Sequence, residues 1–225
     1  MVQLVSDGPS TTHAALDGAT VRRWIRESAD VFSSQRDYLT QLDAAIGDAD
    51  HGINMDRGFS AAVVDLDAVD GSAPGELLTR VGSTLVYRVG GAAGPLFGGC
   101  FRQVGSALGT TETFDAEDLL KALRAGLDAI QGLGAAVEGD KTIVDAFVPA
   151  LQAFERDLRA GRDVGQASHR AAEAAKEGSR ETIPMQARKG RASYLGPRSV
   201  GHQDPGATST ALLFAALAKV VGDQS

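Results

Sequence analysis

The sequence has little of what several protein classes require. It contains one cysteine, Cys100, so no disulfide can form within the chain. The net charge of −7 argues against a general binder of nucleic acid or of membrane surfaces, because both are polyanions. Residues 1–13 lack the charged and then apolar layout of a signal peptide. Together these absences predict a cytoplasmic protein with no nucleic-acid partner.

Long hydrophobic runs are also missing. The longest strongly apolar stretch, residues 211–221, is interrupted by Lys219 and falls short of the roughly 20 residues that a membrane-spanning helix needs. We therefore expect no membrane span. With 225 residues and 43% hydrophobic content, the chain can bury a sizeable core. We predict a flexible extension at residues 1–13 and one all-helical nucleotide-binding domain over residues 14–225.

Strand signals are scarce and helical signals are abundant. Aromatic residues make up 5% of the chain, and apolar residues recur at helical spacing. The pattern predicts an all-α protein in which short connections join antiparallel neighbours. Periodicity alone does not distinguish a bundle from a closed barrel. Eight helices are predicted, near residues 15–40, 52–68, 74–89, 95–108, 115–131, 142–158, 164–179 and 206–221.

Three carboxylates cluster where the first predicted helix gives way to the second. Asp43, Asp48 and Asp50 would repel one another unless a cation lay between them, and magnesium prefers carboxylate oxygens. The alternative is that Asp48 or Asp50 caps the helix, but one cap uses one carboxylate. An EF-hand calcium loop is excluded, because the sixth position counted from Asp48 is Ile53 instead of glycine. The cluster predicts a metal site.

Two glycine-containing connections have different interpretations. Residues 90–95 place small side chains before a helix start, which suits either an anion site or close helix packing. Residues 139–142, with Gly134, approximate a Walker A loop, but Asp140 intrudes between the glycine and the lysine, and the preceding segment is helical in pattern. We interpret that segment as a helix start capped by Thr142 and Asp145.

The segment 182–204, called the basic loop below, is long for a connection in a compact domain. It contains Arg188, Lys189, Arg191 and Arg198, with no acid before its last residue, Asp204. Such a segment is typical of a functional lid, although a solvated loop is the alternative. Its end has the pattern of a helix start, with Asp204 as N-cap and Pro205 at the first helical position.

In combination, these motifs resemble the L subunits of dihydroxyacetone kinases, over the chain from about Leu39 onward. The resemblance rests on Asp43 with residues 47–55 (GDADHGINM), 90–96 (GGAAGPL), 139–142 (GDKT), 188–196 (RKGRASYLG) and 201–207 (GHQDPGA). It implies an eight-helix antiparallel barrel that binds ADP, or ATP, with two Mg²⁺ ions. Asp43, Asp48 and Asp50 would be the metal ligands, and Arg191 and Lys189 the catalytic residues. The implied nucleotide-binding residues are His51, Gly52, Ile53, Asn54, Ala92, Ala93, Gly134, Arg191, Asp204, Pro205 and Gly206.

The resemblance also implies a reaction and partners. A phosphoryl group would pass to dihydroxyacetone, or a close short ketose, held on a separate K subunit, and a phosphohistidine-carrying M subunit would recharge the nucleotide. A homodimer is also compatible with the sequence. Two alternatives remain: an ATP-dependent kinase subunit with exchanging nucleotide, and a non-catalytic nucleotide-loaded regulator.

Two residues depart from the family pattern. Ala49 replaces the usual glycine, and Ala93 replaces a serine or threonine. The missing hydroxyl at Ala93 would remove one phosphate hydrogen bond, worth about 0.5–1.5 kcal/mol net.

Overall fold

The computed structural model describes residues 15–71 and 73–223, so the predicted extension at 1–13 lies outside the described residues. Within them the chain is helical nearly throughout, which confirms the all-α prediction. The helices are α1 (Gly18–Ile46), α2 (His51–Asp67), α3 (Pro74–Arg88), α4 (Ala93–Leu108), α5 (Ala116–Gly134), α6 (Val144–Arg159), α7 (Val164–Glu181) and α8 (Pro205–Gly222). A 3-10 helix, η1 (Arg191–Ser199), lies between α7 and α8, inside the basic loop.

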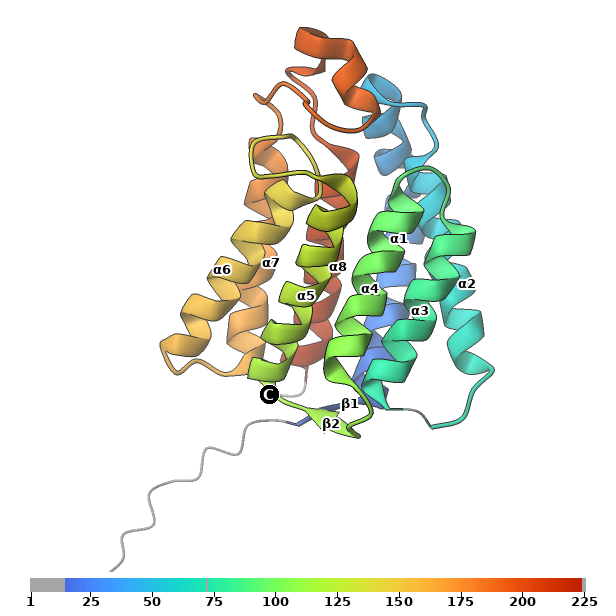
Figure 1. The fold of residues 1–225 in the computed structure, drawn as a ribbon, viewed down its shortest axis with the longest axis vertical. Helices are drawn as coiled ribbons and strands as arrows, with labels where there is room; N and C mark the ends of the chain where they lie inside the picture. The colour runs from blue at the N-terminus through green and yellow to red at the C-terminus, as the bar shows by residue number, and fades with distance from the viewer. Residues whose placement is uncertain (1–14, 72, 224–225) are drawn as a thin grey trace, which may run out of the picture.

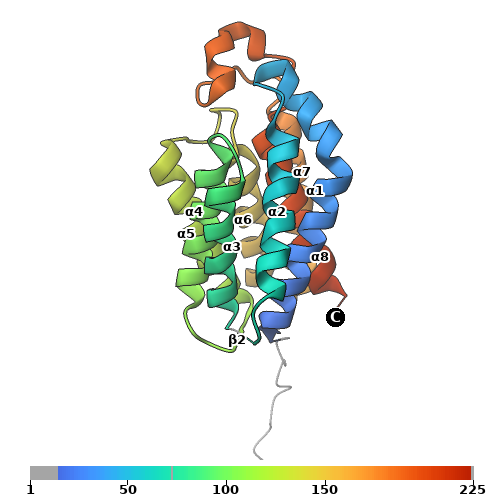
Figure 2. The same ribbon diagram turned by 90° about the vertical axis from the view of Figure 1, so that its right-hand side faces the viewer.

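The eight α-helices form a closed antiparallel barrel (Figures 1 and 2). Each helix packs against the next one in the chain, and α8 returns to pack against α1, which closes the ring. The main hydrophobic core of the described residues takes buried side chains from all eight helices. The fold is therefore a closed barrel and not a bundle, a choice that periodicity alone did not allow.

Because successive helices run in opposite directions, the connections between them alternate between the two ends of the barrel. The α1–α2, α3–α4, α5–α6 and α7–α8 connections lie at one end, at the top of Figure 1. The three other connections lie at the opposite end, near the C-terminus. All the motifs singled out in the sequence fall on connections of the first group, so the topology alone gathers them at one end.

The structure differs from the predicted elements in three places, one of which is the 3-10 helix η1 in a segment predicted as a loop. Helix α1 continues to Ile46, beyond the predicted end at residue 40, because Ile46 is buried against Ala187 and Ala192 of the basic loop. Two short strands, β1 (Leu16–Asp17) and β2 (Thr113–Phe114), pair antiparallel. Strands of two residues are too short to show the alternation by which a strand is predicted.

Helix α8 is long and apolar enough to cross a membrane, judged by length and composition only. In the structure 72% of this segment is buried inside the protein, between α7 and α1. Its apolar character thus follows from its place in the core of the barrel.

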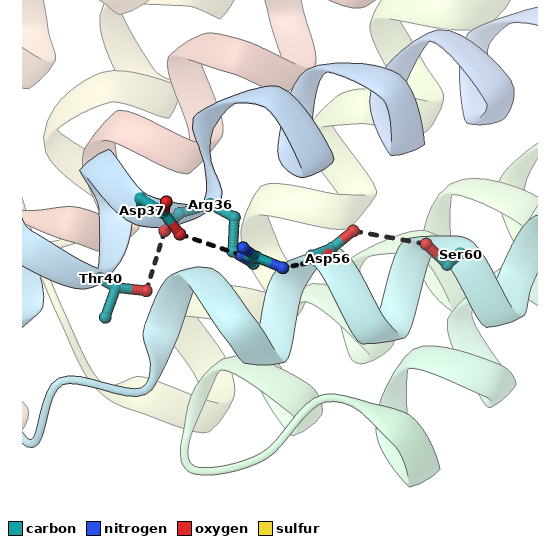
Figure 3. Close-up of polar contacts among 5 residues, drawn as sticks. All are labelled: Arg36, Asp37, Thr40, Asp56 and Ser60. Atoms are coloured by element: carbon teal, nitrogen blue, oxygen red, sulfur yellow. Dashed lines mark hydrogen bonds and ion pairs between the residues drawn. The ribbon is translucent and has the colours of Figure 1, made fainter.

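The start of α2 lies unusually close to α1. A Cβ atom on Gly52 would lie 2.0 Å from the backbone oxygen of Arg36 and 2.6 Å from Oγ1 of Thr40. Next to this contact, the Arg36 guanidinium lies 4.0 Å from the Asp56 carboxylate of α2, and Thr40 donates to the Arg36 oxygen at 2.8 Å (Figure 3). Glycine at position 52 therefore sets how closely the acidic connection approaches α1.

We predict that Gly52→Ala lowers the free energy of unfolding by about 1–3 kcal/mol, because the added methyl group meets backbone that must shift. Urea unfolding followed by circular dichroism measures this. Gly99→Ala is the matched control, since nothing lies within 4 Å of its Cβ position in α4. That control should raise stability by about 0.5–1 kcal/mol. Equal stability of the Gly52→Ala variant and the wild type would contradict the close approach.

Candidate functional site

The end of α1 and the turn into α2 bring the three predicted metal ligands together. One carboxylate oxygen each from Asp43, Asp48 and Asp50 lies within 4.8 Å of the other two. Asp43 is buried, Asp50 is half-buried and Asp48 is exposed. Hard oxygen donors in this arrangement fit a divalent cation such as Mg²⁺, which is bound through one or two carboxylates together with phosphate oxygens and water. The donor set therefore fits the metal that the sequence predicts.

Asp43 has a second role that the sequence did not indicate. Its Oδ2 accepts hydrogen bonds from the backbone N–H groups of Asp50 (2.9 Å) and His51 (3.2 Å), so it caps α2 from the end of α1. Asp50 occupies the N-cap position but makes no capping hydrogen bond with its side chain. Capping thus accounts for Asp43 and leaves the carboxylates of Asp48 and Asp50 for another purpose.

The turn between α1 and α2 is built around the Asp43 carboxylate. A Cβ atom on Gly47 would lie 2.0 Å from Oδ1 of Asp43, so a side chain at position 47 would displace the carboxylate. Two residues later, Ala49 has a φ of 62°, in the left-handed region that glycine adopts most readily. This backbone conformation gives a physical reason for the glycine that the family usually has at this position.

The carboxylates line a pocket of about 320 Å³ at the connection end of the barrel. The predicted nucleotide-binding residues that line it are His51, Asn54, Ala92, Ala93, Gly134, Arg191, Asp204, Pro205 and Gly206, together with Lys189. Two predicted residues are absent from the lining: Gly52 packs against α1, and Ile53 is 50% exposed. The pocket joins all four connections of this end of the barrel, as the topology requires.

The glycine-rich connection supplies an open helix start. Helix α4 begins at Ala93, and Ala92 at its N-cap position makes no side-chain capping bond. Both residues line the pocket. Because the first N–H groups of a helix lack partners within the helix, this end of α4 can donate to an anion. The interpretation as close packing also holds next to it, since a Cβ atom on Gly94 would meet the backbone oxygen of Val89 at 2.3 Å.

His51 is the first residue of α2, and its side chain makes a hydrogen bond to α8. Its imidazole is buried, and Nε2 lies 2.7 Å from Oγ of Ser209 in α8. Burial lowers the pKa of His51 below its usual value, although the Asp43 and Asp50 carboxylates oppose this shift. The hydrogen bond joins α2 to α8, so His51 has a structural role as well as a place in the pocket lining.

An apolar wall of the pocket was missed in the sequence. It consists of Leu96 from α4, Ile130 from α5, Ala136 from the α5–α6 connection and Ile143 next to α6. Each of these residues also belongs to, or packs against, the main core, so nothing in its sequence context marks it as ligand-binding. Such a wall suits the flat, weakly polar ring of a nucleobase.

The basic loop lies over the pocket beside the carboxylates. Nη2 of Arg191 lies 2.9 Å from Oδ2 of Asp48, and Lys189 lines the pocket. Both predicted catalytic residues therefore line the pocket, and Arg191 contacts one of the predicted metal ligands. Arg188 and Arg198 are not part of the lining.

The end of the basic loop follows its predicted pattern. Asp204 caps α8 by accepting a hydrogen bond from the Ala207 N–H at 2.7 Å, and Pro205 is the first helical residue. Burial raises the pKa of the Asp204 carboxyl to about 7, although the Ala207 N–H and the Lys141 ammonium oppose the shift.

The 139–142 turn is not a Walker A loop, because helix α5 precedes it where that motif requires a strand. Asp145 accepts hydrogen bonds from the backbone N–H groups of Gly139 (2.5 Å) and Thr142 (2.7 Å), and Oγ1 of Thr142 accepts from the Val144 N–H at 3.2 Å. Thr142 and Asp145 therefore shape the turn before α6, but the predicted cap is wrong in detail, because Ile143 takes the N-cap position and makes no side-chain capping hydrogen bond.

We predict that Ala49→Gly raises the free energy of unfolding by about 0.5–1 kcal/mol. Relief of the left-handed backbone strain should stabilise the folded state by about 1–2 kcal/mol. The greater conformational entropy of glycine in the unfolded chain should offset about 0.4–1 kcal/mol of this gain. Ala61→Gly, inside α2, is the control and should lower stability by about 0.5–1 kcal/mol. If both substitutions destabilise the protein equally in urea unfolding, the left-handed geometry at position 49 is incorrect.

Comparison with known proteins identifies relatives over nearly the whole chain. The model of the DAK2 domain matches residues 45–219. The chain is 43% identical over 204 residues to the ADP-binding subunit DhaL of the PEP-dependent dihydroxyacetone kinase of Escherichia coli, covering 91% of this chain and 97% of the relative. It is 38% identical to the corresponding subunit of a PTS-dependent dihydroxyacetone kinase of Lactococcus lactis, covering 90% and 97%.

Larger proteins contain the same domain. The L-erythrulose 1-kinase of Mycolicibacterium smegmatis is 40% identical over 80% of this chain, which spans 31% of that protein. The crystal structure of the dihydroxyacetone kinase from C. freundii in complex with AMP-PNP and Mg²⁺ superposes with a TM-score of 0.70 at 25% identity, over 97% of this chain and 37% of that one. The matched length and the shared fold agree: the chain belongs to the DAK2 domain family.

Proposed function

We propose that this chain is the nucleotide-binding subunit of a dihydroxyacetone kinase, and that it holds ADP with two Mg²⁺ ions in the pocket at the connection end of the barrel. The observation that carries the proposal is the meeting of three carboxylate oxygens within 4.8 Å, in a pocket that also has an open helix start and two basic side chains. Relatives of the same length are ADP-binding subunits of such kinases, which supports the assignment.

Charge balance supports this composition of the site. A bound diphosphate carries about −3, so that with three carboxylates the site holds about six negative charges. Two Mg²⁺ ions neutralise four of them, and Lys189 and Arg191 lie in position to offset the remaining two. The ions would be held by Asp43, Asp48 and Asp50. The small side chains of Ala92 and Ala93 leave the start of α4 open to phosphate oxygens.

The base would be held by the apolar wall of the pocket, which consists of Leu96, Ile130, Ala136 and Ile143. These side chains are apolar and fixed in the core, so they give a base a contact surface that needs no rearrangement on binding. Adenine would thus contact apolar residues, and the charged residues would hold the phosphates.

When bound, the nucleotide carries a phosphoryl group and the metal ions neutralise its phosphates. The chain's own contribution is positioning and electrostatic stabilisation, as phosphoryl transfer generally allows. Arg191 and Lys189 hold the negative charge of the transferred group, and the basic loop keeps water away from it. The acceptor is dihydroxyacetone, or a close short ketose, on a separate K subunit, and a phosphohistidine-carrying M subunit recharges the nucleotide in place.

We predict that Asp48→Asn weakens Mg²⁺-dependent ADP binding by about 100-fold or more, since even the outer partners of metal ligands contribute about 10–100-fold. Calorimetric titration with ADP in the presence of Mg²⁺ measures the affinity, and native mass spectrometry shows whether ADP and two Mg²⁺ ions remain bound to the purified protein. Asp67→Asn is the control, because Asp67 is exposed at the end of α2 that is remote from the pocket. Unchanged ADP affinity in the Asp48→Asn variant would contradict the proposal.

A second candidate is an ATP-dependent kinase subunit whose nucleotide exchanges freely. The observation that favours it is Ala93, which offers no hydroxyl to phosphate at the start of α4. Dialysis separates the two candidates. For the phosphohistidine-linked subunit we expect ADP to stay bound through prolonged dialysis with Mg²⁺. Rapid loss of ADP, followed by full activity with free ATP and a K subunit alone, would select the exchanging kinase instead.

A further inference from the structure

Lys141 has an unusual position beside the pocket. It is 1% exposed, although lysine is rarely buried without partners. Its backbone has a φ of 63°, in the left-handed region, where a residue with a side chain is strained. The strain is maintained by Asp145, which accepts hydrogen bonds from the N–H groups on either side, at Gly139 and Thr142. The turn thus forces the Lys141 side chain inward.

The ammonium group of Lys141 contacts three backbone carbonyl oxygens and no other acceptor among the described residues. It donates to the oxygens of Thr182 (2.7 Å), Met185 (3.2 Å) and His202. An ammonium has three N–H donors, so all of its hydrogen-bonding capacity is used. Lys141 is therefore not free to bind phosphate as the lysine of a Walker A loop does.

The three carbonyls belong to the two ends of the basic loop. Thr182 and Met185 lie where the loop leaves α7, and His202 lies where it enters α8. Three further hydrogen bonds close the same base: Gly201 N–H to the Ile183 oxygen (2.8 Å), Asp204 N–H to Oγ1 of Thr182 (2.9 Å) and Arg188 N–H to the Asp140 oxygen (3.1 Å). Among these contacts, Lys141 is the side chain from outside the loop that reaches both of its ends.

We propose that Lys141 is a positioning residue that clamps both ends of the basic loop and thereby sets Arg191 over the pocket. The inference deepens the proposed function, because it rests on the basic loop closing over the nucleotide. Its physical basis is that one cation, held by the 139–142 turn, neutralises three carbonyl dipoles that converge at the base of the loop. Near the tip, Ala187 and Ala192 pack on Ile46 of α1, so the loop is fixed at its base and seated at its tip.

The carboxylates of Asp204 and Asp145 support this arrangement. Burial lowers the pKa of the Lys141 ammonium, and both carboxylates counteract that effect by favouring the charged form. The positive charge also lies close to the N-cap of α8, so the same side chain connects the loop base with the helix start that contributes Asp204, Pro205 and Gly206 to the pocket.

Hydrogen exchange of the uncomplexed protein tests the clamp without any nucleotide. In Lys141→Met we expect exchange in peptides from the basic loop to become at least about tenfold faster, while peptides from α3 and α4 keep their protection. Lys141→Asn is the second variant, since asparagine accepts a left-handed backbone but is too short to reach the carbonyls. It covers the case in which Lys141→Met does not fold. Lys219→Met is the control, because Lys219 pairs with Glu27 on the surface between α8 and α1 and should leave loop exchange unchanged.

ADP affinity tests whether the clamp acts through Arg191. We expect Lys141→Met to weaken Mg²⁺-dependent ADP binding by about tenfold in the wild-type background and by less than about twofold in the Arg191→Ala background, because the effects of two residues coupled through the same loop are not additive. A purely structural loss would act equally in both backgrounds and would overturn the inference, as would wild-type loop exchange in a folded Lys141 variant. If the wild type itself fails to bind ADP, the proposed function fails, while the exchange experiment still decides the role of Lys141 as a clamp.

Discussion

The main physical constraint on the site is the electrostatic repulsion among three carboxylates, whose oxygens the chain holds within 4.8 Å of one another. Their neighbours fix this arrangement before any ligand arrives: Gly47 leaves space for the Asp43 carboxylate, and Asp43 is committed to the N–H groups at the start of α2. Ala49 accepts a strained backbone in the same turn. A fold that maintains such a cluster needs a compensating cation, and Arg191 supplies one positive charge at Asp48.

The barrel topology explains why the functional parts can be dispersed along the chain. Because successive helices run in opposite directions, every second connection returns to the same end, and four connections share one pocket (Figure 1). Site residues inside the helices, such as Asp43, Asn54 and Ile130, lie within about one turn of these connections, and the remaining turns build the core. Chemistry at the connections can therefore vary while the packing between helices stays the same, which is consistent with the occurrence of this domain both as a separate subunit and within longer kinases.

Sequence reasoning succeeded where the signal is local. The acidic cluster spans eight residues, so its proximity in space follows from its proximity in the chain, and the N-cap at Asp204 is recognisable from its neighbours alone. The apolar wall could not be predicted, because Leu96, Ile130 and Ile143 are also ordinary core residues and meet only through helix packing. The end of α1 at Ile46 and the hydrogen-bond partners of Lys141 likewise depend on contacts with the distant basic loop.

A crystal structure grown with ADP and Mn²⁺ in place of Mg²⁺ tests the central claim most directly, because manganese can be located by its anomalous scattering. The account predicts two anomalous peaks among Asp43, Asp48 and Asp50, in contact with the diphosphate and with Arg191 shifted toward the phosphate oxygens. Carboxylates that point into solvent with no ion between them, at saturating Mn²⁺ and ADP, would contradict it.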